Sequence, residues 1–174
     1  VAPSFIRFGS FQIHTADGNH ETLSQLLKHT ITNHFPEHTI DEDDGIITWL
    51  KHVAATTAEM IAHWMRVGFV HGVMNTDNMS IHGLTIDYGP YGWLENYDPN
   101  WTPNTTDSST RRYRYGQQAQ IGAWNIARLA EAVAPLMDDV QSLYSVLEHY
   151  ENKYIEYQNA CLLYTSDAAD ERRR

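Results

Sequence analysis

The segment HGVMNTDNMSIHGLTIDYGP, residues 71–90, places two aspartates, two asparagines and two histidines between short apolar runs. Its alternation predicts two short strands joined by a tight turn. Asp77 and Asn78 precede this predicted hairpin, and Asp87 follows it. Two explanations are open at this point: a solvated turn, or oxygen-bearing side chains that converge on one cation.

Around this segment the sequence is mainly helical in pattern. Apolar residues repeat at three- and four-residue steps before and after it, which is typical of helices that bury one face. Residues 1–15 are the exception, because their apolar residues fit an extended strand in which Gly9 marks a bulge. The expected helices are a short one that ends before Pro36, a long one over 45–67 with Gly68 as its C-cap, and two over 118–134 and 137–159; the expected strands cover 79–81 and 84–86.

The composition limits the classes of function. The chain has 174 residues, 42% of them hydrophobic, which is enough for one domain with a sizeable core. Its net charge of −10 argues against a nucleic-acid partner or an anionic membrane surface. No apolar run approaches the roughly 20 residues that span a bilayer. The single cysteine excludes an internal disulfide framework.

The 71–90 segment matches part of the protein-kinase template. Kinases carry a catalytic loop H-R-D-x-x-x-x-N, followed after a short hairpin by D-F-G. His71 and Asn78 match the first and last residues of that loop, and Asp87-Tyr88-Gly89 falls where D-F-G is expected. The catalytic aspartate of the template would fall on Val73, which cannot accept a proton. The segment therefore predicts a cation site without the usual kinase base.

Further segments carry a more specific resemblance. FIRFG at 5–9, HGVMNTDNMSI, LTIDYGPYG, PNTTD at 104–107 and WNIARLAEAVAPL at 124–136 occur in the order found in the selenoprotein O family of protein adenylyltransferases, whose members are also called pseudokinases. The resemblance implies a mainly α fold with a small β-hairpin, part of a protein-kinase-like C-lobe. It also implies Mg²⁺-dependent transfer of AMP from ATP to Ser, Thr or Tyr hydroxyls of proteins, with release of pyrophosphate.

The resemblance assigns roles to four residues. Asp77 is the proton acceptor, and a structural or metal-shell role is the alternative. Asn78 and Asp87 are ligands of Mg²⁺, with Mn²⁺ as the other candidate ion, and Asp87 also lies near the nucleotide. Arg7 binds the ATP phosphates, for which a planar guanidinium is well suited; a plain salt bridge is the alternative. His71 is expected to bond to backbone near Asp87 rather than to catalyse.

The resemblance also sets expectations for the extent of the domain. Residues 1–160 are expected to be an internal piece of the adenylyltransferase domain, inactive alone, with the N-lobe and its lysine upstream. The tail at 161–174, CLLYTSDAADERRR, resembles the translation of a sequencing-library adapter and is excluded from the fold.

Two other functions remain open for the parent protein: an ordinary kinase-type phosphotransferase, and a non-catalytic nucleotide-binding pseudokinase. The family implies a cytoplasmic location in bacteria and a mitochondrial one in eukaryotes.

Overall fold

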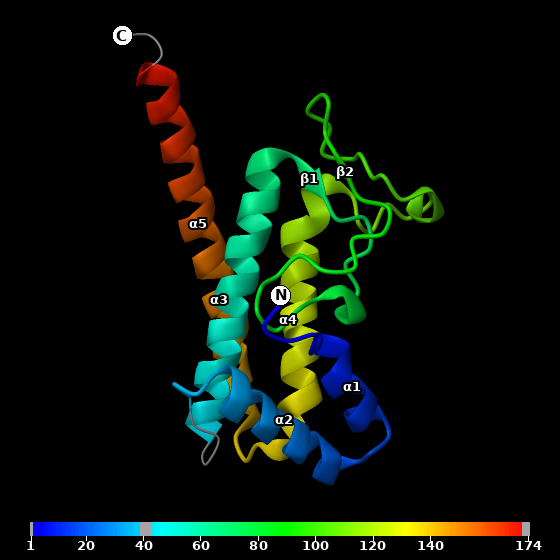
Figure 1. Cartoon of the computed structure of the whole chain (residues 1–174), viewed down its shortest axis with the longest axis vertical. Helices are drawn as coiled ribbons and strands as arrows, with labels where there is room; N and C mark the ends of the chain where they lie inside the picture. Colours follow the sequence, from blue (N-terminus) through cyan, green and yellow to red (C-terminus); the bar gives the residue numbers. More distant parts are fainter. Residues whose placement is uncertain (1, 39–42, 172–174) are drawn as a thin grey trace.

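Helix α3, Asp43–Val67, is the central element of the fold (Figure 1). The computed structural model describes residues 2–38 and 43–171, and side chains through residue 162. The stripe that predicts this helix is buried, and Trp49, Leu50 and Ile61 are fully inaccessible to solvent. Gly68 ends the helix with φ of +70°, a left-handed conformation that favours glycine. The predicted long helix is therefore confirmed.

Helix α3 packs against the two C-terminal helices, α4, Gln118–Val133, and α5, Tyr144–Glu171 (Figure 1). The prediction started α5 too early, at residue 137. Short 3₁₀ turns, Ala134–Leu136 and Val140–Leu143, intervene, and the Asp139 carboxylate caps the second by accepting from the Gln141 N–H at 2.9 Å. The tyrosine stripe of α5 packs into the core as predicted, and Tyr150 is 2% exposed. The adapter origin of residues 161–174 stays a prediction.

The N-terminal segment corrects the prediction of an extended strand. Residues from Phe8 form a helix, α1, Phe8–Ala16. Its apolar residues fit either pattern, but Phe8 and Phe11, one turn apart, are both fully buried. The Ser10 hydroxyl accepts a bond from the Arg7 N–H at 3.3 Å, which helps to start the helix. Arg7, which precedes the helix, has an extended backbone.

Helix α2, His20–His34, confirms the predicted short helix. The Asn19 carboxamide oxygen accepts from the Thr22 N–H at 3.1 Å and caps its first turn. Leu23, Leu27 and Ile31 are buried on one face. The helix ends at Phe35, which is 2% exposed and precedes Pro36.

The prediction of two paired strands at 79–81 and 84–86 is wrong. The turn is present, but the only ladder contact there is one bridge between Met79 and Thr85. The Gly83 Cα packs so tightly against α3 that a Cβ would lie 2.6 Å from the Thr56 carbonyl oxygen. Ser80, which follows Met79, forms a bridge with Arg7. Residues 79–80 therefore make one bridge to each of two segments instead of a continuous ladder with residues 84–86.

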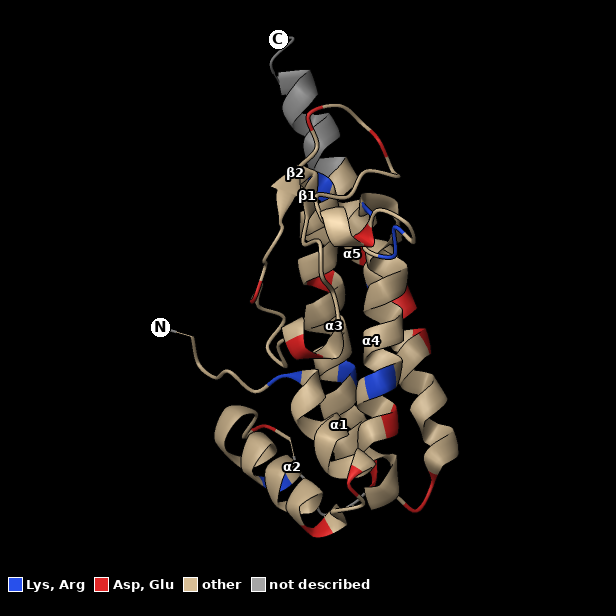
Figure 2. Cartoon of the chain, turned by 90° about the vertical axis from the view of Figure 1, so that its right-hand side faces the viewer, with Lys and Arg blue, Asp and Glu red and all other residues tan. Residues whose placement is uncertain are grey.

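The small sheet is formed by residues that flank the predicted hairpin in the chain. Strand β1, Phe69–Val70, pairs antiparallel with β2, Gly92–Trp93 (Figure 1). The fold is thus mainly helical with a small antiparallel sheet, as predicted. Of the helices in the two described stretches, none has the length and apolar character needed to cross a membrane. Acidic residues are spread over several helices and loops rather than gathered on one face (Figure 2).

Candidate active site

His71 connects β1 to the segment that carries Asp87. Its ring is fully buried, Nε2 lies 2.8 Å from the Ile86 carbonyl oxygen, and Nδ1 lies 3.3 Å from the Val73 N–H. These partners assign the proton to Nε2 and leave Nδ1 as the acceptor. Burial lowers the pKa of His71, which favours this neutral form. The expectation of a histidine that bonds to backbone beside Asp87 is confirmed.

Backbone bonds bring the N-terminal segment to the same place. The Phe8 N–H donates to the Met79 carbonyl at 3.0 Å, and the Ile81 N–H donates to the Ile6 carbonyl at 3.4 Å. Met79 in turn bridges Thr85. The three segments that carry Arg7, Asn78 and Asp87 therefore lie side by side, although 80 positions separate the first from the last.

Arg7 and Asp87 form a direct ion pair. Arg7 Nη2 lies 2.7 Å from Asp87 Oδ2, and the two side chains are 39% and 44% exposed. An ion pair this exposed contributes only about 0–1 kcal/mol to stability. Asp87 also has φ of +47°, a conformation in which Asp and Asn are the usual non-glycine residues. Backbone conformations of this kind cluster at ligand-binding and active sites, so Asp87 stays a candidate site residue. The salt-bridge alternative for Arg7 is thus observed, and its partner is the other predicted nucleotide residue.

Asn78 is held by the residue that replaces the kinase aspartate. Its Nδ2 donates to the Val73 carbonyl at 2.8 Å. This bond uses the donor end of the amide, so the acceptor oxygen Oδ1 is oriented away from Val73. An amide oxygen on this loop and the Asp87 carboxylate form the hard oxygen donor set that Mg²⁺ prefers. The donors are therefore chemically suited to the predicted ion.

Asp77 lies against the first turn of α1. It is exposed, and its Oδ1 is so close to Gly9 that a Cβ on Gly9 would lie 1.9 Å away. The start of a helix favours a negative charge. This contact supports the structural alternative for Asp77, while its role as proton acceptor stays a prediction. Gly9 lies in helix α1, so the predicted strand bulge is wrong, and its missing side chain makes room for Asp77.

Two polar residues that sequence patterns do not single out hold the loop in shape. Asn104 Nδ2 donates to the Gly72 carbonyl at 3.0 Å, and its Oδ1 accepts from the Thr106 N–H at 3.0 Å. Gln118 Oε1 accepts from the His71 N–H at 3.1 Å, and its Nε2 donates to the Phe69 carbonyl at 2.9 Å. Both are buried, so each bond replaces one to water. PNTTD is the one local signal, because Asn followed by Thr-Thr is typical of an Asx turn.

Asp107 holds the start of the basic and aromatic stretch at residues 111–114. Its carboxylate accepts bonds from the Thr110 hydroxyl at 2.6 Å and from the Arg112 and Tyr113 N–H groups at 2.9 and 2.8 Å. Burial alone would raise the pKa of Asp107, but these bonds outweigh burial and lower it. The Arg112 guanidinium lies 4.5 Å from the ring centre of Trp124. These contacts connect Arg112 and Tyr113 to Asp107 and α4, while residues 108–111 are exposed.

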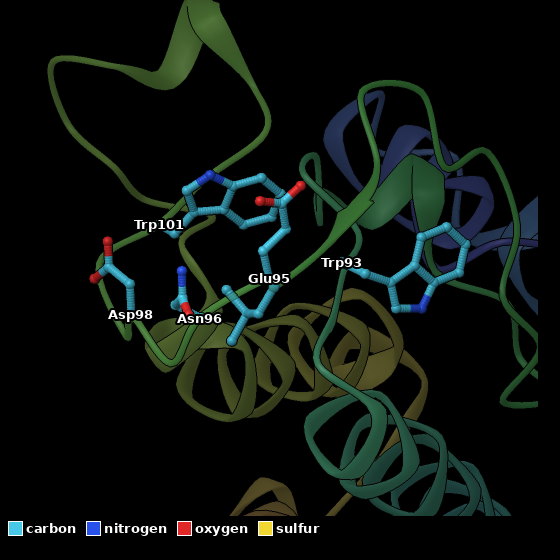
Figure 3. Close-up of a pocket in the computed structure, with 6 residues that line it drawn as sticks. Trp93, Glu95, Asn96, Asp98 and Trp101 are labelled. Carbon is cyan, nitrogen blue, oxygen red and sulfur yellow. The ribbon is translucent and has the colours of Figure 1, made fainter.

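A separate pocket lies beyond β2 (Figure 3). It has a volume of about 450 Å³, and Glu95 extends alongside Trp101 in it while the Trp93 ring lies apart (Figure 3). Two of the residues that line it are acidic, Glu95 and Asp98, which makes it unsuitable for phosphates. None of the four predicted site residues lines this pocket.

Comparison with known proteins identifies the family. A model of the family described as Protein adenylyltransferase SelO matches residues 1–165. A protein nucleotidyltransferase YdiU of Flavobacterium johnsoniae is 54% identical over 98% of the chain and 34% of its own length. Relatives with the same name from Xanthomonas campestris pv. campestris and Rhodopirellula baltica are each 55% identical, over 89% and 88% of the chain. The chain spans about a third of the length of these relatives. It belongs to the SelO family of protein adenylyltransferases.

Proposed function

We propose that the full-length protein transfers AMP from ATP to Ser, Thr or Tyr hydroxyls of other proteins and releases pyrophosphate. The observation that supports this most is the 2.7 Å contact between Arg7 and Asp87, next to the segment that carries Asn78. The family match supports nucleotidyl transfer as the reaction class. We also propose that the helices belong to a kinase-like C-lobe and, given the bacterial relatives, that the protein acts in the cytoplasm.

In this proposal, different residues of the site bind the cation, bind the phosphates and position the loop. Asn78 and Asp87 hold a divalent cation, Mg²⁺ or Mn²⁺, which supplies positive charge to the phosphate oxygens of ATP. Arg7 moves its guanidinium between Asp87 and a phosphate, since both are anionic oxygens. His71 and Asn104 hold the backbone of the loop in place through the bonds to Ile86 and Gly72.

The covalent step needs a proton acceptor. A hydroxyl oxygen of the target protein attacks the α-phosphorus of ATP, and the bond from that phosphorus to the bridging oxygen breaks, so that pyrophosphate leaves. The hydroxyl proton passes to the Asp77 carboxylate. Val73 offers no acceptor at the position that kinases use, and this disfavours γ-phosphoryl transfer by the kinase route.

The choice of phosphorus tests this function. A full-length relative, such as the Flavobacterium johnsoniae protein, is incubated with Mg²⁺, a protein acceptor and ATP labelled at either the α- or the γ-phosphorus. Protein-bound label is expected from α-labelled ATP only. Label from γ-labelled ATP would establish a kinase, and label from neither would support a non-catalytic nucleotide-binding protein.

Replacing the residue at the position of Asp77 with Asn separates its two roles. Asn keeps the size of the side chain next to Gly9, but its amide cannot act as the proton acceptor. We expect kcat to fall by about 10²- to 10⁴-fold, with little change in KM for ATP. The measurement is the initial rate of AMP transfer over a range of ATP concentrations, which separates kcat from KM. A rate within about threefold of wild type would assign Asp77 a structural role only.

A further inference from the structure

A second cluster of potential metal ligands lies between the end of α2 and the middle of α3, away from the candidate active site. His38 Nε2 lies 3.4 Å from His52 Nδ1. Glu37 Oε1 lies 3.6 Å from the same atom of His38 and 3.9 Å from that of His52. The three atoms form a nearly equilateral triangle of two imidazole nitrogens and one carboxylate oxygen.

The sides of this triangle match metal coordination better than hydrogen bonding. Direct bonds between such groups have heavy-atom distances of about 2.7–3.2 Å, and all three distances here are longer. A zinc ion that holds its ligands tetrahedrally at about 2.1 Å places any two of them about 3.4 Å apart. The rings of His38 and His52 are nearly perpendicular, at 83°, so that both can direct a nitrogen towards one point without stacking.

The residues around the cluster hold the ligands in this arrangement. Phe35, which ends α2, is buried, and the His38 N–H donates to its carbonyl oxygen at 2.9 Å. The Phe35 ring packs edge-on against His52 at 5.3 Å and stacks on His82 at 4.9 Å. Packing against Phe35 thus positions the two imidazole rings before any ion binds.

We propose that Glu37, His38 and His52 bind one Zn²⁺ ion, with a water molecule as the fourth ligand. Two imidazoles and one carboxylate are a known zinc ligand set, whereas Mg²⁺ prefers oxygen ligands. The Glu37 side chain is 55% exposed, so the fourth position faces solvent. The ion would fasten the turn after α2 to α3, and through Phe35 and His82 it would support the 71–90 segment. This site does not depend on the proposed function.

Zinc titration of the purified chain tests the site. Calorimetry in the presence of excess Mg²⁺ is expected to show one Zn²⁺ per chain, and Co²⁺ in its place should give the visible absorption of a low-symmetry, nitrogen-bound site. His52→Ala and His38→Ala should each weaken zinc binding by at least about 100-fold. Removing a ligand lowers the metal affinity more than removing a residue that only hydrogen-bonds to a ligand, which lowers it by about 10- to 100-fold. Zinc should also raise the melting temperature of the wild type but not of these variants.

His20→Ala is the matched control, because His20 lies at the opposite end of α2. It should bind zinc like the wild type. His52→Gln, checked by circular dichroism, replaces His52→Ala if the alanine variant does not fold. The proposal is overturned if the wild type binds no stoichiometric zinc, or if the ligand variants and the control bind it equally well.

Discussion

Replacing Asp87 with Asn at the aligned position of a full-length relative should lower the rate of AMP transfer by about 10³-fold or more. Asn keeps the shape of the side chain but removes the charge that pairs with Arg7 and that would hold the cation. Losing a single well-placed electrostatic contact to the reacting groups commonly costs 10²- to 10³-fold, and here the affinity for the metal falls as well. The measurement is kcat/KM with α-labelled ATP over a range of Mg²⁺ concentrations, in which high Mg²⁺ should restore part of the rate.

Asp17→Asn is the control for this experiment. Asp17 is an exposed residue at the C-terminal end of α1, and the same loss of one negative charge there should leave the rate unchanged. A rate for the Asp87 variant within about threefold of the control would show that the carboxylate takes no part in catalysis.

Gly72→Ala should destabilise the chain by about 2–5 kcal/mol. Gly72 has φ of +86°, and a Cβ there would lie 2.5 Å from the Pro90 carbonyl oxygen. The left-handed backbone costs a non-glycine residue about 1–2 kcal/mol, and overpacking adds about 1–3 kcal/mol. The bond from Asn104 to the Gly72 carbonyl resists any shift that would relieve the clash. Urea unfolding followed by circular dichroism gives the free energy of unfolding.

Gly18→Ala separates the two contributions. Gly18 also has a positive φ, +67°, but no atom lies within 4 Å of a Cβ built there. The free energy of unfolding of Gly18→Ala should therefore fall only by the cost of the left-handed backbone, about 1–2 kcal/mol. Equal losses for the two variants would mean that the contact with Pro90 does not constrain the loop.

The sequence predicted the elements whose pattern is long and periodic. Helix α3 carries its apolar stripe over 25 residues, so few alternatives fit. Helix α1 has nine residues, and its phenylalanines fit a strand as well as a helix. Its outcome depends on the burial of Phe8 and Phe11 against the rest of the core, which is a tertiary effect. The hairpin failed for the same reason, since Ser80 pairs with Arg7 instead of extending the ladder.

In the candidate site, too, features with a local sequence pattern were predicted and those that depend on tertiary contacts were not. Asn78 and Asp87 match the kinase motif, and the family resemblance adds Arg7 and Asp77 as site residues. Their partners were not predicted, because the pairing of Arg7 with Asp87 and the contact of Asp77 with Gly9 join segments far apart in the chain. Asn104 and Gln118 gave little local signal, since their role is to bond distant backbone. His52 gave no signal as a ligand, because nothing in its neighbourhood along the chain points to His38.

The central claim is that Asn78 and Asp87 jointly hold a divalent cation that carries a nucleotide. A crystal structure of a full-length relative with Mn²⁺ and a non-hydrolysable ATP analogue tests this directly, because the anomalous signal locates the ion. The account predicts one ion bonded both to the amide oxygen at the position of Asn78 and to the carboxylate at the position of Asp87, each at about 2.1–2.2 Å. An ion bound to neither group, or to one while the other faces away from the nucleotide, would contradict it.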